Sequence, residues 1–214
     1  MSPSKIQIII SGGGTGGHIY PAISIANALQ KIDPELRIAF IGARDRLESQ
    51  IVPQYGFQFF PISAAGFPRG LTLQWIPVML KVVAGLIQAI QLLRQIKPLV
   101  VVGTGGYVSG LVLCAAILNR IPTVLQEQNA VPGLTNRILA TWVREAYLAL
   151  PAANSYFPPE VGKETGNPIR PEIGQQSPRT PELFQKYGLS PDLKTIFVMG
   201  GSQGATAINQ LILG

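Results

Sequence analysis

The sequence contains little of three things: cysteine, histidine and charge. Its 214 residues include one cysteine, one histidine and 13% charged residues, whereas 47% are hydrophobic. The single cysteine, Cys114, excludes an internal disulfide framework and is typical of a protein from a reducing compartment. Because so apolar a composition excludes a disordered chain, we expect a globular protein with one substantial core and part of a second.

A targeting segment is also lacking. The first residues show no basic region followed by a cleavable apolar stretch, so we expect no secretory signal and a cytosolic protein. The charge that is present has an excess of one sign, with a net charge of +6 and an isoelectric point near 9.7. This excess favours an anionic partner, and charge alone does not choose between nucleic acid, a phosphorylated substrate and an anionic membrane surface.

Strand-like and helix-like patterns alternate over the first two thirds of the chain. Buried strands are predicted at 5–10, 36–42, 57–63, 98–103 and 121–126, and helical stretches separate most of them. Right-handed crossovers then give an α/β fold with a doubly wound parallel sheet, and the loops that follow its strands gather at one edge. Ligands are expected at that edge.

The composition changes after Leu150. Residues 151–182 are rich in proline, glycine and small polar residues and allow only a short strand, which is typical of an interdomain crossing. A helix at 182–188, a strand at 194–201 and a helix from 204 are predicted after it. We therefore expect one domain over 1–165, and over 166–214 the crossing and the start of a second, incomplete Rossmann-like domain, because one βα unit cannot bury its own faces.

Three glycine-rich turns each follow a predicted strand and lead towards a helix. They lie in IQIIISGGGTGGH, LVVVGTGGYVSG and TIFVMGGSQGA. Glycine has no Cβ to hold a ligand away, and a helix N-terminus offers unpaired N–H groups and a partial positive charge, so such turns accept phosphate or sugar oxygens. A tight turn without a ligand is the alternative for any one of them.

The first of these turns also fits the glycine spacing of a dinucleotide site, through Gly12, Gly14 and Gly17. The acidic residue that should close the second strand is missing, because Asp45 comes only after Arg44. A dinucleotide-dependent oxidoreductase is therefore a weak alternative. A phosphate-binding loop of the Walker type is excluded, since no glycine loop is followed by Gly-Lys-Ser/Thr.

Candidate functional side chains lie where other loops reach the same edge. His18 is near a helix start, where a neutral imidazole suits a general base, and bonding to nearby backbone is the alternative. The stretch LQEQNAVPGLTNR concentrates polar side chains that suit sugar recognition or a surface turn. Arg170 and Ser202 are candidates for phosphate contacts.

Five stretches in this order resemble the motifs of the MurG family of glycosyltransferases: GGGTGGHIYPA, GTGGYVSG, EQNAVPGLTNR, GNPIR and GGSQGA. The resemblance spans essentially the whole chain. It implies a GT-B architecture, in which two Rossmann-like domains flank a cleft. It also implies transfer of N-acetylglucosamine from UDP-N-acetylglucosamine to the C4 hydroxyl of lipid I, with inversion at the anomeric carbon and with no metal or other cofactor.

The resemblance assigns roles to individual residues. His18 matches the base that is proposed in the family. The residues that match contacts of the UDP-sugar are Thr15, Gly16, Gly17, Asn129, Arg170 and Ser202. The residues that would cradle the acceptor diphosphate are Gly13, Gly14, Thr104, Gly105, Gly106 and Tyr107. No metal ligands are expected.

The resemblance also implies where the protein works. Its expected partners are UDP-N-acetylglucosamine, lipid I and an anionic membrane surface, but not nucleic acid, and its expected place is the cytoplasmic face of the bacterial plasma membrane, as a peripheral protein. The apolar stretch 71–98 is predicted to be a helix that packs a broad face on the sheet and touches the membrane near Trp75 and Met79. A buried crossover helix without membrane contact and a membrane span are the alternatives.

Other interpretations remain open from sequence alone. The family's second domain continues well beyond the residues present here, so we expect this chain to bind donor poorly and to catalyse weakly or not at all. A non-catalytic module that binds a membrane or a partner is therefore the main alternative. A glycosyltransferase that acts on another lipid acceptor is a variant of the first interpretation.

Overall fold

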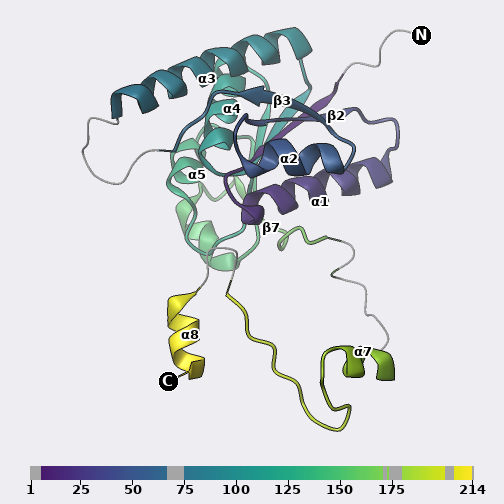
Figure 1. The fold of residues 1–214 in the computed structure, drawn as a ribbon. Coiled ribbons are helices and arrows are strands. Elements are labelled where there is room, and N and C mark those ends of the chain that lie inside the picture. Colours follow the sequence, from purple (N-terminus) through teal and green to yellow (C-terminus); the bar gives the residue numbers. More distant parts are fainter. Residues whose placement is uncertain (1–5, 67–74, 171–172, 174–179, 201–204, 214) are drawn as a thin grey trace. The chain divides into compact units, whose positions relative to one another are not determined.

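A seven-stranded parallel sheet forms the centre of the protein (Figure 1). The computed structural model describes residues 6–66, 75–170, 173, 180–200 and 205–213. The sheet has the order β3-β2-β1-β4-β5-β6-β7. Its strands are β1 (Ile8–Gly12), β2 (Ile38–Ala43), β3 (Gln58–Ile62), β4 (Val100–Gly105), β5 (Thr123–Glu127), β6 (Glu145–Leu148) and β7 (Gly162–Glu164). The predicted doubly wound α/β fold is confirmed, and the direction of winding reverses between β1 and β4.

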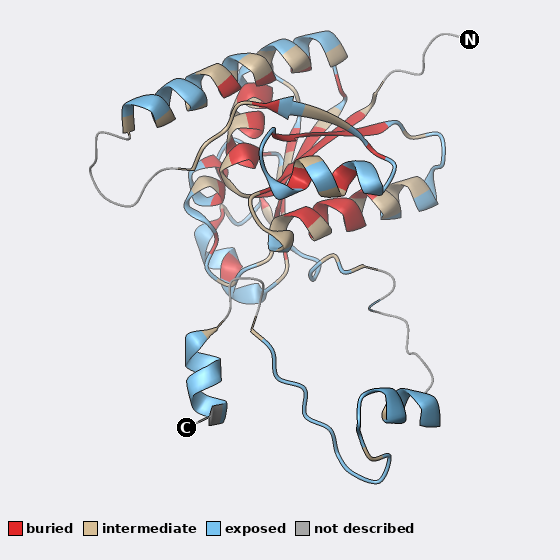
Figure 2. Cartoon of the chain, viewed as in Figure 1, coloured by how far each residue is buried: buried red, intermediate tan, exposed pale blue. Residues whose placement is uncertain are grey.

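Helices cover both faces of the sheet. The helices α1 (Gly16–Ile32) and α2 (Leu47–Gln54) lie on one face, and α3 (Trp75–Ile96), α4 (Tyr107–Leu118) and α5 (Leu134–Leu139) belong to the other (Figure 1). Neighbouring strand residues point to opposite faces, so Ile8 and Ile10 pack with α1 whereas Ile9 packs with α4. Figure 2 shows the resulting buried layer in the strands and in the inner faces of the helices.

The last two strands extend the sheet beyond the prediction. All five predicted strands form, but β6 was not foreseen, and β7 corresponds to no more than the short strand allowed after Leu150. Each has four residues or fewer, and β6 takes its register from β5, with Leu125 opposite Ala146. Such short segments form because a neighbouring strand supplies the hydrogen bonds, which local sequence does not reveal. A 3₁₀ helix, η1 (Pro151–Tyr156), joins them.

The predicted packing of α3 on the sheet is confirmed only for its inner side, where Ala89 and Leu93 share a core cluster with Ile62 of β3. The helix contacts mainly α4, and only Gly85, Ala89 and Leu93 are fully buried. A Cβ added to Gly85 would lie 1.9 Å from the carbonyl oxygen of Ser63, so the glycine permits this close approach. At 22 residues and a hydropathy of 1.9, α3 is long and apolar enough to cross a membrane, although a core helix of a soluble protein meets the same criteria.

The contacts divide the chain into two units, Met1–Arg170 and Pro171–Gly214. In the second unit, α7 (Pro181–Lys186) and α8 (Thr206–Leu213) form where helices were predicted. The strand predicted at 194–201 is wrong for the described residues 194–200, where Ile196 and Phe197 are more than 80% exposed. A strand needs a neighbour, and the described part of this unit provides none. The expected division after residue 165 stays a prediction.

Candidate functional site

The candidate site lies at the carboxyl ends of β1 and β4, where the winding of the sheet reverses. A first glycine loop (residues 12–17) leads from β1 into α1, and a second glycine loop (residues 103–107) leads from β4 into α4. The two loops touch, because the backbone N–H of Gly13 donates to the carbonyl oxygen of Gly105 at 3.3 Å. In an open α/β sheet this crevice is the usual place for a ligand.

The second glycine loop depends on two glycines with positive φ. Gly105 has φ 110° and Gly106 has φ 86°. A Cβ on Gly106 would lie 2.3 Å from the carbonyl oxygen of Gly13, and a Cβ on Gly105 would lie 2.6 Å from Nδ1 of His18. Backbone strain and space therefore both require glycine here. The structure thus brings together the two loops that sequence assigned to the acceptor diphosphate.

Both loops end in helix N-termini without a side-chain cap. Thr15 and Gly106 are the N-cap residues of α1 and α4, neither makes a capping side-chain bond, and neither first turn contains an acidic residue. The first N–H groups of an α-helix have no partner within the helix and carry a partial positive charge. These two helix ends are therefore suited to an anion, and phosphate oxygens match their geometry.

A buried carboxylate that sequence reasoning missed holds the first glycine loop. Glu48 of α2 is 1% exposed and accepts hydrogen bonds from the backbone N–H groups of Gly14 and Ala43, both at 3.1 Å. The acidic residue nearest to this loop is therefore bonded to the protein's own backbone, while Asp45 is exposed. Neither observation favours a ribose contact, so the oxidoreductase alternative gains no support. The sequence did contain a signal for this role, because Glu48 is an acidic residue in the first turn of α2, the helix that follows the second strand.

His18 lies in the first turn of α1 and bonds to the carboxyl end of β4 and to the residue that follows β5. Its ring nitrogen Nδ1 is 3.1 Å from the carbonyl oxygen of Thr104 and 3.1 Å from Oε1 of Gln128. The hydroxyl of Thr104 donates in turn to the carbonyl oxygen of His18 at 2.8 Å. Nε2 has no hydrogen-bond partner among the described residues, and the side chain is only half-buried. The free nitrogen is thus available to a ligand.

The loop after β5 is organised differently, around the carboxylate of Glu127. This side chain is 1% exposed and accepts four hydrogen bonds at 2.7–3.2 Å. The donors are the backbone and side-chain N–H groups of Asn129, the backbone N–H of Gly133 and the side-chain amide of Asn136. Asn129, which sequence assigned to the UDP-sugar, is therefore already bonded within its own loop.

Three further predicted residues have different outcomes. The guanidinium of Arg170 lies 4.5 Å from the centre of the Tyr20 ring, so it stacks beside the first turns of α1. Tyr107 begins α4, and burial raises the pKa of its phenol, with the nearby Arg46 acting in the opposite direction. Its ring therefore stays neutral at physiological pH. Ser202 lies outside the described residues.

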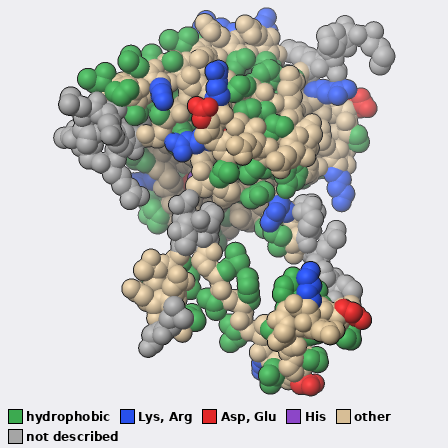
Figure 3. All heavy atoms as spheres, in the orientation of Figure 1, with side chains coloured by type: hydrophobic (Ala, Val, Ile, Leu, Met, Phe, Trp, Pro, Cys, Tyr) green, Lys and Arg blue, Asp and Glu red, His purple; other side chains and the backbone are tan. Residues whose placement is uncertain are grey.

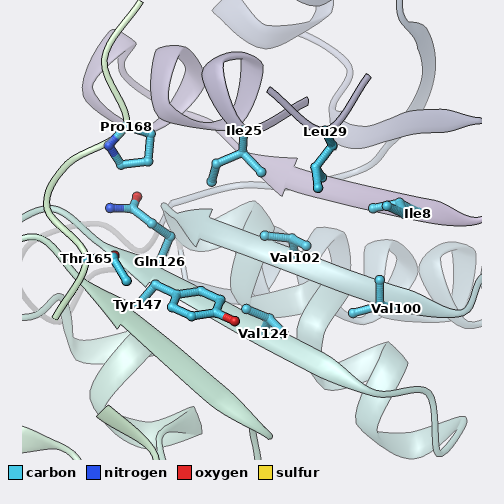
Figure 4. A pocket seen from close by; sticks show the side chains of 10 residues that line it. All are labelled: Ile8, Ile25, Leu29, Val100, Val102, Val124, Gln126, Tyr147, Thr165 and Pro168. Carbon is cyan, nitrogen blue, oxygen red and sulfur yellow. The ribbon is translucent and has the colours of Figure 1, made fainter. Parts of the chain in front are cut away.

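An apolar groove of about 340 Å³ opens on the face of the sheet that carries α1 (Figure 4). It is lined by Ile8, Ile25, Leu29, Val100, Val102, Val124, Gln126, Tyr147, Thr165 and Pro168. Sequence reasoning did not foresee it. It contains no charged group, so it does not suit a diphosphate.

Among the described residues, no cluster of three or more His, Cys, Asp or Glu side chains is placed to hold a metal ion.

The chain is similar to known proteins in family, sequence and structure. Residues 8–148 match the glycosyltransferase family 28 N-terminal domain. A protein of Bacteroides fragilis is 41% identical over 208 residues, and one of Halothermothrix orenii is 46% identical over 211 residues. Both are named UDP-N-acetylglucosamine--N-acetylmuramyl-(pentapeptide) pyrophosphoryl-undecaprenol N-acetylglucosamine transferase. The matches cover 97% of this chain and 55–56% of those proteins, so the chain spans about half the length of the curated relatives it matches.

Solved structures agree on the fold. The crystal structure of MurG from Acinetobacter baumannii is similar with a TM-score of 0.63 and 26% identity, over 79% of this chain and 47% of that chain. HepE of Anabaena, solved with UDP and glucose, has a TM-score of 0.59 at 14% identity, over 86% of this chain and 50% of that chain. The second likeness concerns the fold alone.

Proposed function

The chain belongs to glycosyltransferase family 28, and from this membership and the geometry of the sheet edge we propose that it is the acceptor-side part of an N-acetylglucosaminyltransferase. The complete enzyme transfers N-acetylglucosamine from UDP-N-acetylglucosamine to the C4 hydroxyl of lipid I and produces lipid II. The names of its relatives support this choice of donor and acceptor.

The placement of His18 carries the proposal. Its Nδ1 is bonded inwards to Thr104 and Gln128, and its Nε2 is free beside both glycine loops. Nε2 accepts the proton of the C4 hydroxyl as that oxygen attacks the anomeric carbon. The new glycosidic bond forms, the bond from the anomeric carbon to the UDP oxygen breaks with its electron pair, and the configuration inverts. One base suffices for this direct displacement.

The two glycine loops supply positive potential for the acceptor. The N–H groups at the starts of α1 and α4 hold the diphosphate of lipid I, with Gly13, Gly14, Thr104, Gly105, Gly106 and Tyr107 as the lining. Preorganised N–H dipoles stabilise anionic oxygens without reorganising during the reaction.

The donor contacts come from both parts of the chain, with residues 166–214 as the crossing and the start of the donor domain. Thr15, Gly16 and Gly17 contact the UDP-sugar together with Arg170, whose stacking on Tyr20 keeps a guanidinium near the first glycine loop. A guanidinium there balances the charge of the departing diphosphate. Asn129 reaches the donor with the part of its amide that Glu127 leaves unbonded. Ser202 completes the set, and no cofactor is required.

The exposed half of α3 brings the enzyme to its lipid-linked acceptor. Hydrophobic side chains gather over this helix (Figure 3), and those that are 44–67% exposed are Ile76, Met79, Leu80, Val83 and Ile87. Apolar side chains beside Lys81, on a chain of net charge +6, suit peripheral binding to the anionic cytoplasmic face of the plasma membrane. In liposome flotation we expect more protein with anionic than with neutral lipid. Equal recovery would remove the electrostatic part of this docking.

A transfer assay tests the function. Labelled N-acetylglucosamine is supplied as its UDP donor with a soluble lipid I analogue, to this chain and to a version extended at its C-terminus to the length of its relatives. Transfer by the extended version, and little or none by this chain, is the expected result. No transfer by either protein, with the extended version shown to be folded, would contradict the proposal and favour another acceptor or a binding module.

A further inference from the structure

The hydrogen bonds at His18 determine which of its ring nitrogens carries a hydrogen. Nδ1 faces two oxygens at 3.1 Å, the carbonyl oxygen of Thr104 and Oε1 of Gln128. Both oxygens accept hydrogen bonds and donate none, so Nδ1 must be the donor. In the neutral ring the other nitrogen, Nε2, then has a lone pair and no hydrogen.

The orientation of the Gln128 amide follows from an unambiguous acceptor. Its Nε2 lies 2.7 Å from the carbonyl oxygen of Thr104, and only an N–H donor is stable at that distance from a carbonyl. The other end of the amide, Oε1, must therefore face His18. The same Nε2 also donates to Oε1 of Gln126, which is 1% exposed. The carbonyl oxygen of Thr104 thus fixes the orientation of the amide, and the contact with Gln126 agrees with it.

The side-chain amides of Gln126 and Asn167 extend this hydrogen-bond network away from His18. Nε2 of Gln126 lies 3.4 Å from Oδ1 of Asn167, a weak contact to the segment that leads out of the sheet. Gly105 also approaches the imidazole so closely that an added Cβ would lie 2.8 Å from Cε1 of His18. The backbone of the second glycine loop and the Gln128 amide therefore both contact the ring.

We propose that Gln128 is a positioning residue, which accepts the Nδ1 hydrogen and so keeps His18 in the tautomer whose Nε2 is a proton acceptor. The inference rests on the proposed function, since a bare Nε2 matters because a hydroxyl proton has to be removed. In the parent chain the carbonyl oxygen of Thr104 also accepts from the Gln128 amide, whereas Oε1 of Gln128 faces the imidazole. Without Gln128, His18 keeps one acceptor, the carbonyl oxygen of Thr104, and gains freedom to rotate.

The tautomer is directly measurable, because the chain contains one histidine. ¹⁵N NMR of the imidazole nitrogens in this chain, at a pH where the ring is neutral, is expected to show hydrogen on Nδ1. In Gln128→Met, which keeps the length of the side chain and removes the acceptor, we expect a mixture of both tautomers. Hydrogen on Nε2 in the parent, or an unchanged tautomer in the variant, would overturn the proposal.

A matched variant distinguishes the specific effect of Gln128 on the imidazole from the general effect of losing a hydrogen bond made by a glutamine. Gln88 on α3 accepts a hydrogen bond from the backbone N–H of Ser63 at 2.7 Å, away from the histidine. Gln88→Met should change stability by an amount similar to Gln128→Met and leave the imidazole spectrum as in the parent. A spectrum altered equally by both variants would show that the effect is indirect.

Kinetics in the C-terminally extended enzyme give a second readout. Gln128→Met is expected to lower kcat about 10- to 100-fold with little change in KM for the donor, because a wrongly placed proton affects the reaction and not ground-state binding. A raised KM with unchanged kcat would contradict positioning. Absence of transfer in the extended parent enzyme would sink the proposed function instead, and the NMR result on this chain would still decide the tautomer.

Discussion

The loops after β1 and β4 and the loop after β5 have similar polar, glycine-containing sequences, yet they use their polar groups in opposite ways. The two glycine loops end at helix N-termini with no side-chain cap and leave Nε2 of His18 free. The loop after β5 directs its donors onto one buried carboxylate, Glu127. The first pair of loops is thus built to accept a ligand, and the second to hold its own shape.

The difference shows that polar sequence at a sheet edge is not by itself a binding site. What distinguishes the regions is whether an acceptor lies within reach of the loop's own N–H groups. Glu48 meets only one N–H of the first glycine loop, that of Gly14. Glu127 meets the N–H groups of three different residues. Variants in the glycine loops and in the loop after β5 therefore test whether each loop serves ligand binding or the stability of the fold.

The largest effect is expected from His18→Ala in the extended enzyme. Loss of the base should lower kcat by about 10²- to 10⁴-fold, while donor affinity changes little. Steady-state kinetics and a separate titration with UDP-N-acetylglucosamine measure the two quantities. Turnover close to that of the parent would remove His18 as the base and leave the glycine loops as a binding site only.

Glu127→Gln tests the architecture of the loop after β5. An amide turns an N–H donor towards groups that are themselves donors, so we expect a loss of about 3 kcal/mol in the free energy of unfolding. Urea unfolding of this chain measures it, with the exposed Glu35→Gln as the matched control, for which no change beyond about 0.5 kcal/mol is expected. Equal stabilities of the two variants would show that Glu127 does not organise the loop.

Gly106→Ala tests the backbone of the second glycine loop. Its positive φ and the 2.3 Å approach of the new Cβ to the carbonyl oxygen of Gly13 should cost about 2 kcal/mol or more. Gly133→Ala is the control in the loop after β5, because Gly133 has φ −58° and nothing within 4 Å of its Cβ position. Comparable unfolding midpoints would contradict the assignment of strain to the glycine loop.

Thr104→Val gives the smallest of these effects. The variant keeps the shape of the side chain and removes the hydrogen bond to the carbonyl oxygen of His18, so about 1 kcal/mol should be lost. Thr165→Val, whose hydroxyl makes only a 3.4 Å contact at an exposed position, serves as reference in the same unfolding experiment. Should the two variants be equally stable, the link between β4 and the start of α1 is unimportant.

Much of the fold was predictable, because its signals are local. The five buried strands, the doubly wound topology and the positions of the glycine loops follow from runs of β-branched residues and from the turns after them. β6 and the strand expected at 194–201 were misjudged for one physical reason. A strand exists only beside a partner, so four residues pair at β6, while the described residues 194–200 of the second unit form no strand.

The sequence predicted where the site lies better than it predicted which side chains bond to one another there. Sequence placed His18, Gly105 and Asn129 at one edge, since the carboxyl ends of parallel strands share that edge. It did not reveal that Glu48 and Glu127 are buried acceptors, because burial depends on contacts between distant segments. Nor did it show that Gln128 bonds to His18, a contact across 110 positions of the chain.

The most direct test of the contrast between the loops is a titration of ¹⁵N-labelled chain with inorganic pyrophosphate, followed by backbone amide NMR. The account predicts that the amide signals of residues 13–17 and 105–108 shift together and saturate, while those of Asn129 and Gly133 remain in place. Shifts confined to the loop after β5, or no saturable shift in either glycine loop, would contradict it.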